Sequence, residues 1–205
     1  MQIMTAILSG YFLACLATTL PGMLNMTSVA VSLEHGRRAG RQFAIGTALT
    51  FGLQAAIALI FADYLSENPG IIEGLKKAAV GIFLVLAGYF FIKARRGGVA
   101  KARTTKPGQM YGFGILLAAM NALTIPFFFA MATWLQSEGY LIITPFIILS
   151  FSCAVFMGSL TVFLFYGYSA TYVERRAAFI TRNINYILCG LFVTLASFQV
   201  IGMFT

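Results

Sequence analysis

Long apolar stretches alternate with short polar connections along the whole chain. Six of these stretches reach or exceed the roughly 20 residues that a helix needs to cross a bilayer, and few charged residues interrupt them. Their approximate limits are 3–33, 42–64, 72–92, 110–135, 141–168 and 183–204. The pattern predicts an all-α polytopic membrane protein, in which six transmembrane helices form a single domain over 1–205.

Helix-breaking residues interrupt the first and the fourth apolar stretch. Pro21 has no backbone N–H, and its ring clashes with the carbonyl four residues earlier. Gly22 beside it tolerates unusual backbone angles. In the fourth stretch the interruption runs from Asn121 to Pro126. Lipid offers no partner to the backbone groups that such a break frees, so we expect both breaks to face protein or a water-filled cavity.

The two interruptions occupy corresponding places in the two halves of the chain. The halves, about 1–94 and 109–205, each contain three predicted spans and are joined by a basic loop at about 95–108. At 1.5 Å per residue, each break lies about 18–20 Å from the cytoplasmic end of its span, near the middle of a hydrocarbon core of about 30 Å. Matched breaks are typical of transporters built from inverted repeats. We therefore expect a 3+3 inverted repeat with broken helices one and four.

The distribution of charge predicts how these spans are oriented. Of the 205 residues, 60% are hydrophobic and 10% are charged, whereas soluble proteins average about 25% charged residues. Basic residues gather in the first, third and fifth connections, which the positive-inside rule places in the cytoplasm. Both termini are then outside, in a multi-pass protein of the cell inner (plasma) membrane. These loops account for the net charge of +8, which does not indicate nucleic-acid binding.

Side chains suited to enzymatic or metal chemistry are sparse. Cys15, Cys153 and Cys189 lie in apolar stretches without CxxC spacing, and we interpret them as small hydrophobic residues. The sequence contains no P-loop, HExxH motif or Ser-His-Asp set. No acidic or basic residue lies clearly in the middle of a span. We therefore expect no enzyme activity, no cofactor and no metal site.

The two breaks supply the candidate substrate-binding groups. The first N–H groups of each new half-helix are unpaired and carry a positive partial charge, which attracts a carboxylate. Freed carbonyls and asparagine oxygens accept from an ammonium group, so a small zwitterion fits without any charged side chain. The alternative is a structural kink that a neighbouring helix satisfies. The candidates are Thr19, Pro21, Gly22, Asn25, Thr50, Gln54, Asn121, Thr124 and Pro126.

A polar stripe follows one face of the second predicted span. Thr47, Thr50 and Gln54 stand at positions i, i+3 and i+7 of a helix. Polar side chains are costly in lipid, so this face is expected to turn toward the interior of the bundle. The stripe either lines the substrate pathway or bonds to another helix, and both interpretations stay open at this point.

Several short motifs resemble those of a known transporter family. They are Leu20-Pro21-Gly22, the run from Ser32 to Gly40 with Ile45-Gly46 after it, and Tyr111-Gly112-Phe113-Gly114 leading to Asn121. In these motifs and in its six-span layout, the chain resembles the LysE/RhtB (lysine-exporter-type) amino-acid exporters over essentially its whole length. The resemblance implies an inner-membrane exporter of amino acids, often homo-oligomeric and driven by the membrane gradient. It also places Pro21, Gly22 and Asn121 at the family's broken-helix motifs.

The chain departs from the family pattern at three places. Met23 stands where relatives commonly have a second proline, and Ala122-Leu123 follows Asn121 where relatives have Pro-Lys. Gln54 or its neighbours stand where relatives often place an acidic residue or a histidine. Because no carboxylate would meet a cationic side chain, we expect neutral rather than basic substrates.

These observations together predict an exporter of small amino acids or related zwitterionic metabolites that works by alternating access. Its expected partners are the amino-acid substrate, membrane lipids and further copies of the chain in a homo-oligomer, and no nucleic acid. The alternatives are a non-transporting membrane scaffold, a small inorganic-ion exporter and a redox carrier. A redox carrier of this kind requires paired intramembrane cysteines, and the fourth span has none to match Cys15.

A cysteine introduced into the basic loop tests the predicted orientation. In a cysteine-free background, Gly98→Cys should react with a membrane-impermeant maleimide only from the cytoplasmic side, because loops rich in Lys and Arg stay inside. Everted vesicles and intact cells provide the two sides of the measurement. Labelling in intact cells would reverse the orientation given above.

Overall fold

The computed structural model describes nearly all of the chain up to residue 172, apart from most of 69–108, and it describes little of 173–205. The described residues are 1–20, 22–68, 84–85, 87–88, 91–92, 109–121, 123–172, 190, 193–194 and 197. The basic loop at 95–108 and Pro21 lie outside them, as do almost all of the predicted spans 72–92 and 183–204.

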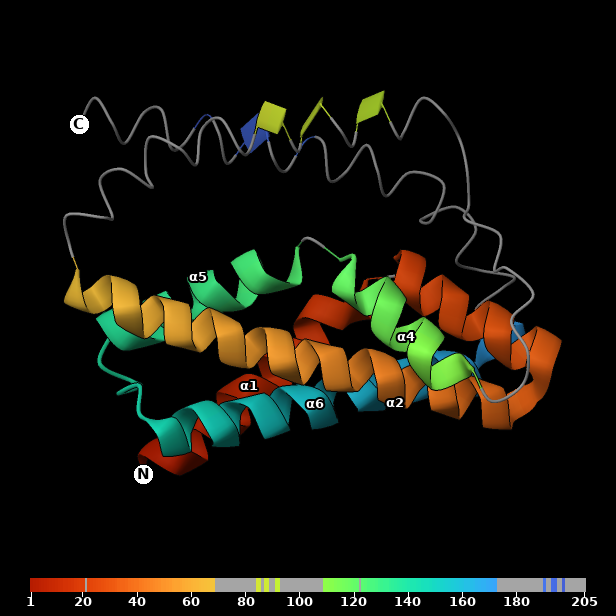
Figure 1. Cartoon of the computed structure of the whole chain (residues 1–205), viewed down its shortest axis with the longest axis horizontal. Helices are drawn as coiled ribbons and strands as arrows, with labels where there is room; N and C mark the ends of the chain where they lie inside the picture. Colours follow the sequence, from red (N-terminus) through yellow and green to blue (C-terminus); the bar gives the residue numbers. More distant parts are fainter. Residues whose placement is uncertain are drawn as a thin grey trace. The chain divides into compact units, whose positions relative to one another are not determined.

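Helices account for nearly all of the described chain, and no strand occurs in it. Figure 1 shows their arrangement. In chain order they are α1 (Gln2–Thr19), α2 (Met23–Glu67), α4 (Met110–Ala119), α5 (Thr124–Ser137) and α6 (Pro145–Tyr168).

The chain divides into two compact units that do not follow the order of the sequence. The first unit combines Met1–Tyr64 with Lys101–Arg176, and the second combines Leu65–Ala100 with Ala177–Thr205. The few described residues of the second unit beyond the end of α2 are mostly helical. The packing and the sites below belong to the first unit. The predicted sequential halves, 1–94 and 109–205, stay a prediction.

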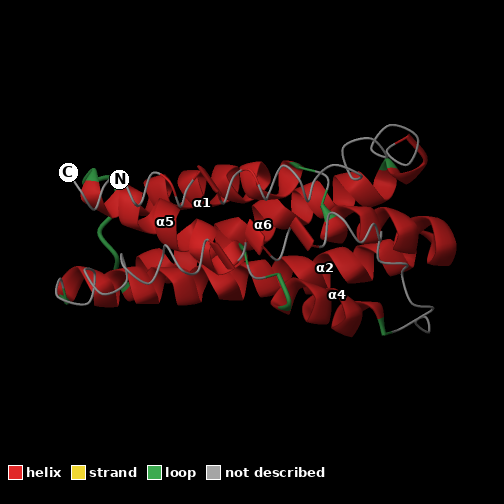
Figure 2. Ribbon diagram, turned by 90° about the horizontal axis from the view of Figure 1, so that it is seen from above, coloured by secondary structure: helices red, strands yellow, loops and turns green. Residues whose placement is uncertain are grey.

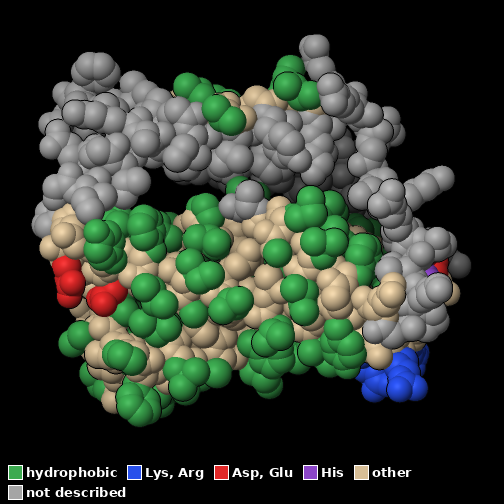
Figure 3. Space-filling model, viewed as in Figure 1, with side chains coloured by type: hydrophobic (Ala, Val, Ile, Leu, Met, Phe, Trp, Pro, Cys, Tyr) green, Lys and Arg blue, Asp and Glu red, His purple; other side chains and the backbone are tan. Residues whose placement is uncertain are grey.

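The helices have the length and the apolar character of membrane spans. Three of them, α1, α2 and α6, are each long and apolar enough to cross a membrane, with mean hydropathies of 1.4, 1.9 and 2.2. α4 and α5 meet at 63° across a short break and together would form a fourth, broken span. Figure 3 shows apolar side chains over the visible flank, with acidic and basic side chains at opposite ends. The predicted all-helical membrane class is therefore confirmed.

α2 is a hairpin of two helical arms rather than one straight helix. Gly36 has φ 82° and ψ 167°, which interrupts the helix, and glycine adopts this positive φ without the steric cost that other residues meet. The arms 23–35 and 37–67 fold back on each other. Gly40 of the second arm lies so close to Ser32 of the first that a Cβ atom on Gly40 would collide with the Ser32 side chain. The second arm alone is about 45 Å long at 1.5 Å per residue, which exceeds the hydrocarbon core of about 30 Å.

Both helix interruptions occur where the sequence predicts them. α1 ends at Thr19 and α2 begins at Met23, while α4 ends at Ala119 and α5 begins at Thr124. The second break precedes Pro126, which lies inside the first turn of α5. Proline is tolerated there because the N–H groups of a first helical turn have no intrahelical acceptor.

Glycines set the distance between α1 and α6, which pack along each other (Figure 1 and Figure 2). A Cβ atom on Gly158 would lie 2.5 Å from the Tyr11 carbonyl oxygen, and one on Gly10 would lie 2.8 Å from that of Phe151. No other residue fits at these distances unless the backbones separate. Small residues of this kind let membrane helices approach closely.

The second arm of α2 packs on α4 in the same manner. A Cβ atom on Gly46 would collide with the Tyr111 carbonyl group. One on Gly114 would collide with the Phe43 carbonyl oxygen and meet the Thr47 side chain. The first unit thus contains two helix pairs, α1 with α6 and α2 with α4, in which glycines of both helices touch the backbone of the partner.

Buried aromatic rings link these helices through the core. Phe51 of α2 and Phe163 of α6 stack edge to face with ring centroids 5.6 Å apart. Phe128 of α5 and Phe151 of α6 do the same at 6.2 Å. None of the four is more than 4% exposed. Edge-to-face geometry is the favoured arrangement for such rings, and it fixes how the helices rotate against each other.

Alanine substitutions at two glycines test this packing. Gly158→Ala should lower the thermal unfolding midpoint in nanodiscs, because the new methyl group collides with the Tyr11 carbonyl. Overpacking of this kind costs about 1–3 kcal/mol. Gly112→Ala is the matched control, since a Cβ atom there meets nothing within 4 Å. Alanine favours helix over glycine by about 1 kcal/mol, so the control should be neutral or stabilising. An equal shift in both variants would contradict the packing.

Candidate functional site

The first break is closed by donors from the protein itself. Asn25 is 3% exposed, and its Nδ2 donates to the carbonyl oxygens of Thr18 at 2.6 Å and of Leu20 at 2.7 Å. The Tyr166 hydroxyl on α6 donates to the carbonyl oxygen of Thr19 at 2.7 Å. Three successive carbonyls at the end of α1 therefore have partners, and both hydrogens of the Asn25 amide are used.

The threonine hydroxyls at this break are also engaged. Thr18 Oγ1 donates to the Ala14 carbonyl oxygen at 2.7 Å, and Thr19 Oγ1 donates to that of Cys15 at 2.6 Å. Gly22 is half-buried. With these groups occupied, the freed carbonyls of the first break are not open to a substrate ammonium group. The geometry there favours the structural kink over the binding site.

Tyr166 is a functional neighbour that the sequence analysis did not single out. It is 8% exposed, and its hydroxyl is the donor to the Thr19 carbonyl oxygen. The only signal in the sequence is a phenol within an otherwise apolar span. A buried tyrosine hydroxyl normally has a hydrogen-bond partner, but the sequence does not show which one.

The second break is organised by an asparagine and a glutamine. The Ala118 carbonyl oxygen, near the end of α4, accepts from the Asn121 backbone N–H at 3.0 Å and from Gln54 Nε2 at 3.3 Å. The Asn121 Oδ1 in turn accepts from the Leu123 backbone N–H at 3.4 Å, which shapes the turn between the helices. Asn121 is thus a turn residue, and Gln54 connects the second arm of α2 to the break.

Two buried polar atoms at the second break have no partner among the described residues. They are Gln54 Oε1 and Thr124 Oγ1, on side chains that are 6% and 4% exposed. Thr124 is the first residue of α5, where the helix presents N–H groups without intrahelical acceptors. An unmade hydrogen bond of a buried group costs about 1–3 kcal/mol. The second break therefore presents an open acceptor and an open hydroxyl beside a helix N-terminus.

The rest of the polar stripe on α2 is satisfied within its own helix. Thr47 Oγ1 donates to the Phe43 carbonyl oxygen at 2.9 Å, and Thr50 Oγ1 donates to that of Gly46 at 3.1 Å. Of the three side chains, only Gln54 forms a hydrogen bond to another helix. The structure thus brings Gln54, Asn121 and Thr124 together at the second break, with Thr50 one turn away and Pro126 exposed. Thr19, Gly22 and Asn25 belong to the first break, between α1 and the first arm of α2.

Neither cysteines nor acidic side chains form a cluster within the described part of the chain. No three His, Cys, Asp or Glu side chains come together there. Cys15 Sγ points at the Gly158 carbonyl oxygen at 3.6 Å, while Cys153 is exposed, and both thiols are free.

No protein-family model, no curated protein and no solved structure matches the chain. The relationship to the LysE/RhtB exporters therefore stays a prediction that rests on the motifs in the sequence.

Replacing Asn25 tests the closure of the first break. Asn25→Ala should destabilise the protein by about 2 kcal/mol, because two buried carbonyls lose their donor. Asn121→Ala is the comparison: it removes one longer hydrogen bond, at 3.4 Å, and should cost clearly less. Unfolding in mixed micelles with increasing sodium dodecyl sulfate measures both. If the two variants unfold at the same detergent fraction, Asn25 does not have this structural role.

Proposed function

We propose that the protein is an inner-membrane exporter of small, neutral amino acids or related zwitterionic metabolites, and that its substrate binds at the second break. The observation that carries this proposal is the pair of buried, unpartnered atoms, Gln54 Oε1 and Thr124 Oγ1. Polar groups inside a membrane protein are costly and usually serve a function. A ligand that supplies their missing hydrogen bonds explains why they are retained.

The chemistry of these groups fits the two ends of a zwitterion. Gln54 Oε1 is an acceptor and suits an ammonium group, while the Thr124 hydroxyl and the first N–H groups of α5 suit a carboxylate. The positive end of the helix dipole adds to the attraction of the carboxylate. Every described Asp, Glu, Lys and Arg lies near the end of a helical arm, so a charged substrate side chain would find no opposite charge here.

The packing of the two helix pairs supports an inverted repeat, which alternating access requires in this proposal. Gly158 touches the Tyr11 carbonyl in one pair, as Gly46 touches that of Tyr111 in the other. Eight positions after each glycine stands a side chain that donates to a carbonyl at the break: Tyr166 at the first break and Gln54 at the second.

Two further contacts agree with this relationship. Phe51 and Phe163 each follow their glycine by five positions, and they stack on each other as equivalent residues near a two-fold axis do. Gly52 of α2 lies against Ser152 of α6, while Gly40, earlier in α2, shares a hollow with Gly167, later in α6. The two helices therefore run in opposite directions. The pairs would then enter the membrane from opposite sides.

The orientation of the proposal follows from the distribution of charge. Arg37, Arg38 and Arg41 adjoin the Gly36 turn, while Asp63 and Glu67 lie at the far end of the same arm. Figure 3 shows these two signs of charge at opposite ends. The positive-inside rule then places the Gly36 turn in the cytoplasm and the N-terminus outside.

Efflux from proteoliposomes tests both the activity and the site. We expect Gln54→Leu and Thr124→Val each to lower the efflux of a small neutral amino acid at least tenfold, since a hydrogen bond to a charged group contributes about 1.5–3 kcal/mol. Thr50→Val is the control, because the Thr50 hydroxyl bonds only within its own helix.

The possible outcomes separate the activity from the site. Unchanged efflux in the Gln54 and Thr124 variants would overturn the site while leaving the exporter. No efflux of any amino acid from the unmodified protein, under either a membrane potential or a pH gradient, would overturn the exporter. Inorganic ions and the scaffold role would then be the remaining candidates.

A further inference from the structure

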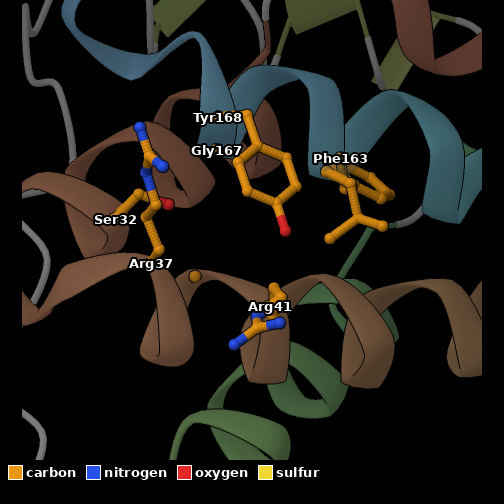
Figure 4. A pocket seen from close by; sticks show the side chains of 8 residues that line it. Ser32, Arg37, Arg41, Phe163, Gly167 and Tyr168 are labelled. Carbon is orange, nitrogen blue, oxygen red and sulfur yellow. The ribbon is translucent and has the colours of Figure 1, made fainter.

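A hollow lies at the turn of the α2 hairpin, on the same end of the first unit as its arginines (Figure 4). It is formed where the two arms of α2 meet the end of α6. Its lining combines two arginines, small residues and aromatic or aliphatic side chains: Ser32, Arg37, Gly40, Arg41, Phe163, Leu164, Gly167 and Tyr168.

One arginine of this hollow, Arg37, lies over an aromatic ring. The guanidinium carbon of Arg37 lies 5.8 Å from the centroid of the Tyr168 ring, within the range of a cation–π contact. In Figure 4 the Tyr168 ring lies beside Arg37, and its hydroxyl points down toward Arg41. Both arginines line the hollow, and their guanidinium groups lie at its rim, pointing in opposite directions.

These positive charges form no ion pair within the described part of the chain. Arg37, Arg38 and Arg41 are exposed, and none forms an ion pair with another described residue. The adjacent acid, Glu34, faces His35 Nδ1 at 4.0 Å instead. Three unpaired arginines within five positions attract an anion to this end of the molecule.

Small residues pack closely together and close the floor of the hollow. A Cβ atom on Gly40 would collide with the Ser32 side chain, and one on Gly167 would lie 2.8 Å from Ser32 Oγ. Phe163 and Leu164 add an apolar wall beside this floor. The hollow is therefore charged at its mouth and apolar along one side, which suits an amphiphile better than a small inorganic anion.

We propose that the exposed arginines at the mouth of this hollow bind the phosphate of an anionic phospholipid headgroup, which lies on the hollow rather than inside it. Arg37 and Arg41 hold the phosphate oxygens, since the planar guanidinium fork matches phosphate geometry. The glycerol end of the lipid lies against the partly exposed Leu164. The place is right for a headgroup, because α6 ends at Tyr168 and the α2 hairpin turns at Gly36. A zwitterionic lipid brings a cation into the same positive field and is disfavoured.

Lipid binding to the purified full-length protein tests this proposal by native mass spectrometry in detergent. The probes are short-chain phosphatidylglycerol and phosphatidylcholine. We expect phosphatidylglycerol to bind at least tenfold more tightly. Arg37→Gln and Arg41→Gln should each weaken its binding about fivefold, as expected for a basic residue close to an anionic headgroup.

Arg38→Gln is the matched control for these variants. It removes the same charge next to Arg37, but Arg38 does not line the hollow. Its binding of phosphatidylglycerol should change by less than about twofold, because exposed charges outside the site act only through a screened field. An equal loss in all three variants would mean diffuse surface attraction and would overturn the site.

Two further measurements complete the test. Inorganic phosphate separates a lipid from a soluble source: displacement of phosphatidylglycerol by equimolar inorganic phosphate would overturn the lipid assignment. Arg37→Lys and Arg41→Lys keep the charge and spare the fold if the glutamine variants do not accumulate. They should weaken binding less than glutamine does but measurably, because they lose the fork. Equal binding of phosphatidylcholine and phosphatidylglycerol to the unmodified protein would reject the proposal.

Discussion

Backbone carbonyls freed inside a membrane must find a hydrogen-bond donor within the protein, and the structure depends on how its two helix breaks meet this demand. At the first break Asn25 and Tyr166 supply three donors to three successive carbonyls. At the second break Gln54 supplies one donor and keeps an unpartnered oxygen. The two breaks therefore differ in kind. The protein completes the hydrogen bonds of the first break alone, whereas the second break keeps two buried polar atoms without a partner among the described residues.

The close contact of the glycines makes both solutions possible. Tyr166 and Gln54 lie on helices that neighbour the broken ones, and each reaches its carbonyl only because the backbones nearly touch. Gly158 and Gly46 set that distance in their respective pairs. The helix packing and these hydrogen bonds therefore depend on each other. A methyl group at either glycine would move Tyr166 or Gln54 away from the carbonyl oxygen to which it donates. Small residues here serve hydrogen bonding as much as they serve van der Waals contact.

The sequence predicted the helical membrane class, both interruptions and the inward turn of the stripe that contains Gln54, because each follows from local composition and periodicity. It did not predict which groups satisfy the breaks. The sequence shows that Asn25 follows Pro21-Gly22. That its amide donates to the carbonyl oxygens of Thr18 and Leu20 depends on the angle between the helices, which the sequence does not show. Tyr166 is 147 positions from its acceptor and carries no local signal. The hairpin at Gly36 was expected only as a loop, since its sharpness comes from a single positive φ.

The Gly36 turn is as short as a connection between two helical arms can be. Only Gly36 separates the arm that contains Asn25 from the arm that contains Gln54, so the arms have no flexible linker between them. A longer linker would let the two arms tilt independently. Here a tilt of one arm must either turn the other or be taken up by the two torsion angles of one glycine. The hairpin therefore joins the helical arms of the two breaks through the φ and ψ angles of one residue.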